Sequence, residues 1–510
     1  MFGTLRQAML WLHGTLGLAF AGLLLLVFFM GSLALYDSEL DRWMLPETRL
    51  PPAPVASLDR QVLPVVQRLT AGQALEQWYV ELPSARVPAL RLQSWDLEGE
   101  GRSHFLDPRD GRVLKTDGSL GGDFFYRLHY SLYLEVGRSG MLLVGLAALA
   151  GLLAIVAGVM IHARLFKDFF TLRPEKPLRR LLDLHNLSGV LALPFHLGIL
   201  LTGLVIQFPL LLPAGILAVY QDQAGEFEAE ARAAYARPAL GEPGALASLD
   251  AMAQRAKALW QAGEPAFLRV WHPGDANAYV EISRSLDDRL NLDGDTLYFG
   301  AADGELLHRS RLAPAASTYS LLAGLHVAHF QHPLLRVLYF LAGLSGCLML
   351  ASGLLYWVAK RRAKGQPVRA MAAFNGALIG GLPLATLGML VANRLLPATL
   401  EPRASWEVAV FVASWSLAAL HALWHVWRAA DERGLWMQQS FAIAALALLA
   451  LGLNGWSTGD HLLRSLTSGQ WAVAGVDLLL LLTALLASWN GRRLARPAAA
   501  RPALEVGANA

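Results

Sequence analysis

Cysteine is nearly absent from this chain of 510 residues, where Cys347 stands alone. A single cysteine excludes a disulfide framework, a zinc site built from several thiolates and a haem attached through Cys-x-x-Cys-His. Charge is also scarce, at 16% of residues, whereas soluble proteins carry about 25%. No nicotinamide or flavin fingerprint and no base-reading motif is visible. The sequence therefore gives no support for a dehydrogenase with its own nucleotide site or for a nucleic-acid-binding protein.

Long apolar runs take the place of the missing charge. Seven uncharged stretches, and an eighth interrupted only by Asp477, are long enough to cross a membrane, which takes about 20 residues. The sequence therefore predicts a polytopic α-helical membrane protein with about eight spans. The runs cover residues 16–36, 139–163, 184–221, 337–359, 370–393, 408–427, 434–459 and 465–491.

The basic residues are distributed unevenly between the two sides of the membrane. The short loops on one side hold only Arg394, Arg403 and Arg464, and most of the remaining loop arginines and lysines, including Arg164 and Lys167, are on the other side. The positive-inside rule places the basic side, and with it both termini, in the cytoplasm. These residues are topology signals, so we expect contact with membrane lipid and no nucleic-acid partner. The first span is longer than the apolar core of a signal peptide and is expected to be retained.

Two polar segments, residues 37–138 and 213–320, are long enough to form small domains on the outer side. In each, helical spacing (57–71 and 245–262) is followed by short β-like runs and an Asp-Gly turn. The first segment has its runs at 78–82, 90–95, 104–106 and 112–114, and the second at 267–271, 278–283, 296–299 and 305–308. We expect two α+β domains.

The unit of helix, outer domain and helix occurs twice. His13 and His185 correspond at an offset of 172, as do Gly31 and Gly203, and Gly151 and Gly158 match Gly346 and Gly353 in spacing. Both copies enter the membrane from the same side, so this is a parallel repeat. The predicted division is span 1 (1–36), domain 1 (37–138), span 2 (139–163), a cytoplasmic loop (164–183), span 3 (184–212), domain 2 (213–320), span 4 (321–359), a four-span bundle (370–491) and a cytoplasmic tail (492–510).

The repeat pairs four histidines. His13 and His185 occupy corresponding positions at the cytoplasmic ends of spans 1 and 3, and His129 and His326 correspond at the outer edges of spans 2 and 4. A pseudo-two-fold axis would bring each pair face to face across a four-helix core. Facing imidazoles are what bis-histidine ligation of haem iron requires. Two such sites at different depths would form an electron path, so we expect two haems of type b.

Other intramembrane or rim histidines leave alternatives open. His196 has no counterpart in span 1 and would share a face with His185 on a straight helix; it is an outer haem ligand, a relay between haems or a hydrogen-bonded core residue. His162 is a replacement inner ligand or a solvated helix end, and His329 has a substrate-side or surface role. His421 and His425 form a metal or third haem site, or a polar rim. Asp477 is proton-linked or interfacial.

Several motifs resemble those of the PepSY-associated transmembrane proteins of bacterial inner membranes. They are Leu12-His13-Gly14-Thr15-Leu16-Gly17-Leu18, Leu128-His129-Tyr130-Ser131-Leu132, Leu193-Pro194-Phe195-His196, Thr202-Gly203-Leu204-Val205 and Gly324-Leu325-His326. The resemblance covers about residues 1–365 and implies that the outer domains are periplasmic PepSY modules. Family members include reductases of ferric siderophores with two b-type haems, which implies haem ligands at His13, His129, His185, His196 and His326.

These observations lead to one principal hypothesis and two alternatives. The principal hypothesis is a dihaem electron-transfer protein of the inner membrane, which takes electrons from quinol or a flavoprotein and reduces a periplasmic ferric siderophore or other ferric iron. The first alternative is a transporter built on the parallel repeat, and the absence of an evident break within the repeated spans argues against it. The second is a regulator whose PepSY modules restrain a periplasmic peptidase.

Overall fold

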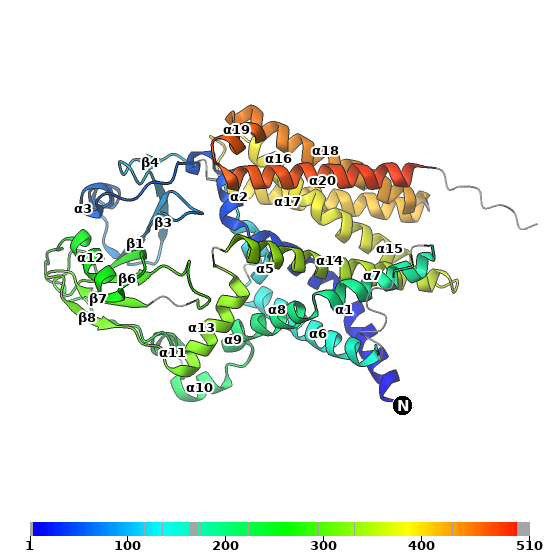
Figure 1. The fold of residues 1–510 in the computed structure, drawn as a ribbon. Coiled ribbons are helices and arrows are strands. Elements are labelled where there is room, and N and C mark those ends of the chain that lie inside the picture. Colours follow the sequence, from blue (N-terminus) through cyan, green and yellow to red (C-terminus); the bar gives the residue numbers. More distant parts are fainter. Residues whose placement is uncertain are drawn as a thin grey trace, which may run out of the picture. The chain divides into compact units, whose positions relative to one another are not determined.

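The computed structural model describes residues 4–496 apart from 117, 135, 163–171, 174, 222–223, 293–294, 331 and 430–431. Arg164, Lys167 and most of the predicted cytoplasmic tail lie outside the described residues. The chain divides into two compact units, Met1–Tyr356 and Trp357–Ala510. Figure 1 labels the elements of both units.

Within the described residues, seven helices are long and apolar enough to cross a membrane, and a bent pair of helices brings the number to eight. The predicted membrane protein with about eight spans agrees with this count. In the first unit the long helices are α1 (Leu5–Ala34), α6 (Ser139–Ile161) and α14 (Pro333–Arg362), the last of which runs on into the second unit. The shorter helices of the first unit are α2 (Asp37–Met44), α5 (Asp123–Ser131), α9 (Phe208–Leu211), α10 (Ala214–Tyr220), α11 (Ala224–Ala231), α13 (Pro314–Val327) and the 3₁₀ turn Pro46–Thr48.

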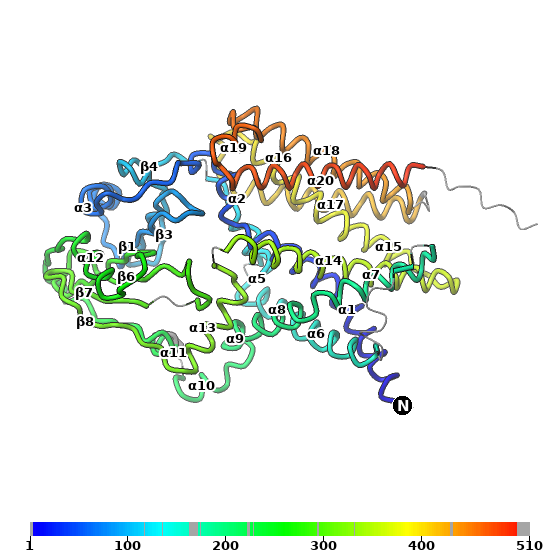
Figure 2. The backbone as a smooth tube through the Cα atoms, in the orientation of Figure 1, coloured from blue at the N-terminus to red at the C-terminus, as the bar shows by residue number. Residues whose placement is uncertain are grey.

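The third span is a pair of helices rather than one straight helix. The chain bends by 67° between α7 (Pro177–Leu191) and α8 (Leu193–Ile206), and Figure 2 traces the backbone through this bend. Pro194 is the second residue of α8, where its ring and its missing N–H end the preceding helix. The prediction that His185 and His196 share one face of a straight helix is therefore wrong, because the two lie on different helices.

The two predicted outer domains are joined into one eight-stranded antiparallel sheet of order β4-β3-β2-β1-β5-β6-β7-β8. The predicted strands are present, and because β1 pairs with β5, the strands of the two predicted domains form one continuous sheet. This pairing satisfies the N–H and C=O groups that each strand would otherwise leave at a sheet edge. The strands are β1 (Leu75–Glu81), β2 (Leu90–Asp96), β3 (Gly101–Leu106), β4 (Val113–Leu114), β5 (Pro265–Trp271), β6 (Tyr279–Arg284), β7 (Thr296–Gly300) and β8 (Leu306–Arg309).

Helices cover one face of this sheet. They are α3 (Leu58–Gln61), α4 (Leu63–Leu69) and α12 (Leu249–Trp260). Their apolar residues form one core with alternate residues of the strands, including Trp78, Val80, Leu268 and Val270. Since successive side chains of a strand point to opposite faces, the intervening residues lie on the face that these helices leave free. In Figures 1 and 2, α3 and α12 lie on the side of the sheet away from α1, α6 and α8.

The second unit contains the four predicted C-terminal spans. They are α15 (Arg369–Asn375) continued by a π-helix (Gly376–Gly380) and α16 (Gly381–Leu395); α17 (Arg403–Trp424) continued by a π-helix (His425–Ala429); α18 (Glu432–Thr458); and α20 (Trp471–Ala495), which follows the short α19 (Leu462–Thr467). Asp477 is fully buried near the start of α20. Asn454 donates to both of its oxygens, at 3.3 and 3.4 Å. Both alternatives for Asp477, proton-linked or interfacial, stay predictions, because burial within the protein does not fix its depth in the membrane.

A reciprocal pair of caps ties the two halves of the sheet domain together. The Leu58 N–H, at the start of α3, donates to Asp250 Oδ1 at 2.6 Å, and the Leu249 N–H, at the start of α12, donates to Asp59 Oδ1 at 2.8 Å. Each aspartate thus satisfies a free N–H at the first turn of the other half's helix, where a negative charge is also favoured.

We predict that Asp250→Ala lowers the free energy of unfolding of the sheet domain by about 1 kcal/mol, the usual cost of a lost helix cap. Asp59→Ala is expected to do the same. Thermal or denaturant unfolding of the purified full chain measures the effect, and Glu98→Ala, which removes an exposed carboxylate from the β2–β3 turn, is the matched control. Equal stability of Asp250→Ala and the wild type would contradict the capping role.

Candidate functional site

Two pairs of histidines face one another within the first unit. The ring centres of His13 (α1) and His185 (α7) are 6.0 Å apart, with 75° between the ring planes. Those of His129 (α5) and His326 (α13) are 6.1 Å apart, with 31° between the planes. The facing arrangement within each pair is the one predicted from the repeat. His129 and His326, however, lie on the short helices that precede α6 and α14 rather than on the spans themselves.

All four imidazoles are held in the same way by a neighbouring helix. In each, Nδ1 lies within hydrogen-bond distance of a backbone carbonyl, which can only accept, so Nδ1 carries the proton. In a neutral imidazole this leaves the lone pair on Nε2, the form in which histidine binds a metal, and such second hydrogen bonds are typical of metal-ligating histidines. The bonds are His13 to Ala154 (2.8 Å), His185 to Met349 (2.7 Å), His129 to Val27 (2.8 Å) and His326 to Ile199 (3.0 Å).

A glycine lies under each of these rings, four residues after the carbonyl that the ring contacts. A Cβ built on any of the four would lie 2.8 to 3.2 Å from the nearest atom of the imidazole, closer than side chains normally approach. The four are Gly158 beneath His13, Gly353 beneath His185, Gly31 beneath His129 and Gly203 beneath His326. The sequence shows the matched spacing of these glycines, but nothing in it indicates that they receive the histidines.

The two pairs lie at different levels along α1. His13 belongs to one pair, and Val27, whose carbonyl holds His129, marks the other. Fourteen residues of continuous helix separate them, which corresponds to about 21 Å at 1.5 Å per residue. A hydrocarbon core is about 30 Å thick, so the pairs are separated by most of the membrane's apolar depth.

His196 belongs to neither pair. It is fully buried in α8, its Nε2 donates to the carbonyl of Ala342 at 3.2 Å, and its ring contacts are with Phe28 and Phe195. Of the three alternatives for His196, these contacts favour a hydrogen-bonded core residue or a relay between haems. The haem-ligand role that the family resemblance implies for His196 stays a prediction.

The remaining candidate histidines lie outside the helices that carry the two pairs. His162 is the C-cap of α6, and His329 follows α13, where burial lowers its pKa. In the second unit, His421 and His425 both donate from Nε2 to the amide oxygen of Gln438, at 2.9 and 3.1 Å. This shared acceptor uses the nitrogens that a metal would need and favours the polar rim. Among the described residues, no group of three or more His, Cys, Asp or Glu is arranged to hold a metal ion.

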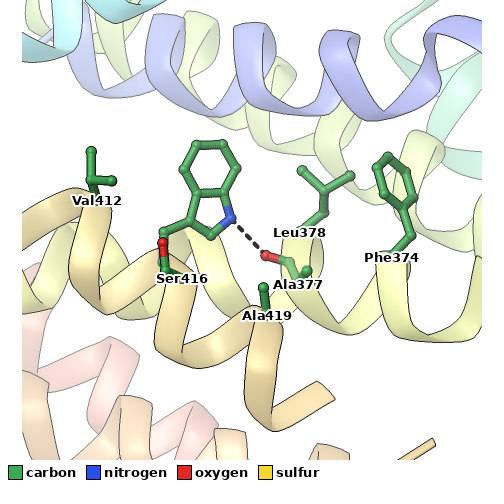
Figure 3. A pocket seen from close by; sticks show the side chains of 7 residues that line it. Phe374, Ala377, Leu378, Val412, Ser416 and Ala419 are labelled. Atoms are coloured by element: carbon green, nitrogen blue, oxygen red, sulfur yellow. Dashed lines mark hydrogen bonds between the residues drawn. The ribbon is translucent and has the colours of Figure 1, made fainter. Parts of the chain in front are cut away.

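The second unit also has an open pocket of about 300 Å³ beside its first π-helix, drawn in Figure 3. Trp415 borders it, and its indole N–H donates to the carbonyl of Ala377 at 2.8 Å. The other lining residues are Phe374, Leu378, Val412, Ser416 and Ala419. The lining is apolar apart from the Ser416 hydroxyl and the Trp415 indole N–H.

A charged cluster joins the sheet domain to the helices beside the His129–His326 pair. Glu39 in α2 accepts from Arg86, in the β1–β2 loop, and from Arg336, in α14, at 2.8 to 3.2 Å, and both arginines also donate to the Leu35 carbonyl. Burial alone would raise the pKa of Glu39, but the two guanidinium groups outweigh it and lower the pKa to about 2. Glu39 is therefore charged at every physiological pH, and the loop is held against α1 and α14.

Comparisons with known proteins agree with this architecture. The family described as PepSY-associated TM region matches residues 10–360, which include both histidine pairs and the sheet domain. An uncharacterized protein of Pseudomonas aeruginosa is 30% identical over 407 residues, which cover 74% of this chain and 96% of that protein.

The close contact between each glycine and its histidine ring predicts that a methyl group added at such a glycine destabilises the fold more than one added at a glycine without such a contact. Gly353→Ala places a methyl group 2.9 Å from His185 Nδ1, and we expect it to lower the free energy of unfolding by about 1–3 kcal/mol, as overpacking does. Gly198→Ala is the control, because its Cβ would meet nothing within 4 Å. Thermal unfolding in detergent measures both, and equal effects of the two substitutions would contradict the contact.

The pH dependence of stability should reflect Asp41, which accepts from the Gly122 N–H at the start of α5, the helix of His129. Burial raises the pKa of Asp41 to about 7 from an ordinary value of 3.8. Because the unfolded chain loses this proton near pH 3.8 and the folded protein only near pH 7, the stability of the fold falls as the pH rises from about 4 to 7. Asp41→Asn keeps an acceptor for Gly122 without the charge. We expect its unfolding midpoint to be close to that of the wild type at pH 4 and to exceed it at pH 8.5; a constant difference would contradict the assignment.

Proposed function

This chain belongs to the PepSY-associated TM family, and from that premise we propose that it is a dihaem electron-transfer protein of the bacterial inner membrane. In this proposal the first unit consists of two copies of the repeat of helix, outer domain and helix. The sheet domain is a joined pair of periplasmic PepSY modules, and both termini are cytoplasmic. The acceptor is periplasmic ferric iron in a siderophore or similar chelate. The observation that carries the proposal is the spacing of the two imidazole pairs.

The residues of both pairs fit b-type haem. Two imidazoles bound to one metal ion from opposite sides, with metal–nitrogen distances of about 2 Å, have ring centres about 6 Å apart. The observed separations are 6.0 and 6.1 Å. Each Nε2 is left as the basic nitrogen by the hydrogen bond at Nδ1, and neutral nitrogen donors suit haem iron. The lone Cys347 leaves no covalent attachment, which is consistent with haem b.

In this proposal His13 and His185 hold one haem, and His129 and His326 hold the other. Bound haem supplies one-electron chemistry between ferric and ferrous iron. The protein's own contribution is to orient the four rings through the carbonyl bonds, and to make room for them with glycines. His162, His329, His421 and His425 have no part in either site. His196 lies apart from the pairs and is left as a core or relay residue.

The electron balance defines what the donor and the acceptor must do. Reduction of one ferric ion to ferrous iron consumes one electron, and a quinol releases two electrons and two protons on oxidation, so one quinol would reduce two ferric ions in succession. The donor, quinol or a flavoprotein, belongs at the His13–His185 end. The acceptor belongs at the His129–His326 end, which is the side of the sheet domain. Ferrous iron binds siderophores weakly, so reduction of the bound ferric ion would release the metal.

A transporter is the second candidate, and one observation favours it. The 67° bend at Pro194 breaks a span, as in transporters whose broken helices expose backbone groups to a substrate. The argument against transport from unbroken spans therefore no longer holds. The transporter account, however, gives no reason for four imidazoles held in two equivalent pairs.

Optical spectra of histidine variants test the proposal. Wild-type protein expressed with adequate haem should bind two haems, visible as Soret and α bands. We expect His13→Ala and His185→Ala to lose the same haem, and His129→Ala and His326→Ala to lose the other, while His196→Ala keeps both. His104→Ala in β3 is the control. Wild-type protein without Soret and α bands would contradict the function, and loss of haem in His196→Ala with retention in His326→Ala would contradict the ligand assignment.

A further inference from the structure

The face of the sheet that α3, α4 and α12 leave free has an arginine at its centre, surrounded by aromatic rings. The guanidinium carbon of Arg269 (β5) lies 5.2 Å from the ring centre of Tyr79, 5.5 Å from that of Phe267 and 5.2 Å from that of Trp271. These three rings come from β1 and β5, at the middle of the eight strands. Single cation–π contacts contribute little, so the concentration of three of them on one partly buried arginine needs a reason.

Further aromatic rings extend this surface across neighbouring strands. Trp95 of β2 stacks on Tyr79 with ring centres 5.4 Å apart. On the other side, Tyr279 of β6 stacks on Trp271 at 6.0 Å. The burial of Tyr79 raises the pKa of its phenol to about 12, so this ring is neutral. The accessible part of the surface is therefore a row of flat, uncharged rings with Arg269 at its centre, and the row ends at Tyr279, which is buried beneath Tyr235 and Arg237.

The guanidinium of Arg269 has an N–H group, at Nε, that lacks a hydrogen-bond partner among the described residues. This nitrogen is shielded from solvent. The nearest carboxylate is that of Glu281, 3.8 Å away, which also accepts from the indole N–H of Trp271 at 3.0 Å. Glu81, the other acid on this face, accepts from the Tyr79 hydroxyl at 3.2 Å. A buried donor without a partner is costly unless a ligand satisfies it.

The position of Arg269 relates it to the outer histidine pair. Tyr79 and Arg269 are direct partners in the β1–β5 register, and they occupy corresponding places in the two halves, since Trp78 and Val80 match Leu268 and Val270. A two-fold rotation exchanging β1 and β5 therefore passes between them, perpendicular to the sheet. The free face is on the side of the sheet toward α5 and α13, the helices of His129 and His326, with the covering helices on the far side (Figure 1).

We propose that this aromatic–arginine surface binds the electron acceptor, and that the acceptor is an anionic ferric chelate bearing aromatic rings, of the catecholate type. That this ligand accepts electrons rests on the proposed function. Catecholate rings stack on Trp, Tyr and Phe, and the negative charge of a ferric catecholate complex is neutralised by the guanidinium. A ferric hydroxamate with an aliphatic skeleton and no net negative charge makes neither contact.

Direct binding to the full-length protein in detergent tests the proposal without reference to electron transfer. The probes are the ferric complexes of 2,3-dihydroxybenzoate and of acetohydroxamate, with affinity measured by isothermal titration calorimetry. We expect the catecholate complex to bind more tightly, and Arg269→Gln to weaken it by about tenfold or more, as loss of a charged contact does. Arg255→Gln is the control, because Arg255 is an exposed arginine on α12, which covers the other face.

The outcomes separate this inference from the proposed function. Unchanged affinity in Arg269→Gln, or a hydroxamate bound as tightly as the catecholate, overturns the surface assignment even when both haem spectra are present. Selective loss of catecholate binding in Arg269→Gln supports the surface, including in a protein that lacks haem, in which case only the proposed function fails. Arg269→Lys keeps the charge without the planar fork, and its partial rescue, with an unchanged unfolding midpoint, shows that the loss is not one of folding.

Discussion

The structure of the first unit depends on one repeated contact, an imidazole seated on a glycine of the neighbouring helix with its N–H on a carbonyl four residues earlier. A polar ring buried between membrane helices is costly unless its donor is satisfied. Glycine lets the ring approach closely enough to reach a carbonyl that is already engaged in its own helix. The contact occurs four times and fixes both which helices pack together and which ring nitrogen is left basic.

The sheet domain imposes a second constraint on the same two halves. Pairing of β1 with β5 and the exchange of caps between Asp59 and Asp250 make one body from two chain segments. Each segment is also anchored to the helices of the first unit: the β1–β2 loop to α2 and α14 through the Glu39 cluster, and the β6–β7 loop to α13, the helix of His326, through the Leu292 N–H, which donates to the Ser320 carbonyl. The helix of His326 is thus tied directly to the sheet.

Much of this architecture follows from sequence patterns, and the exceptions have physical reasons. Apolar runs indicate the spans, alternation indicates the strands, and the repeat indicates which histidines face each other. The bend at Pro194 was not predicted, because an uncharged run looks the same whether its helix is straight or broken. Strand alternation gives the face of a residue but not its distant partner, so the β1–β5 pairing was missed. The glycine spacing was visible, yet which ring each glycine receives depends on how the helices cross.

The most direct test of the central claim is electron transfer across a sealed membrane. Haem-loaded protein is reconstituted into liposomes that enclose a reductant unable to cross the bilayer, with a ferric chelate and a ferrous-iron indicator outside. The account predicts external ferrous iron with the wild type, and none above the protein-free background with the double variant His13→Ala, His185→Ala. Equal rates for the two proteins, or no ferrous iron from wild-type protein that carries both haems, would contradict it.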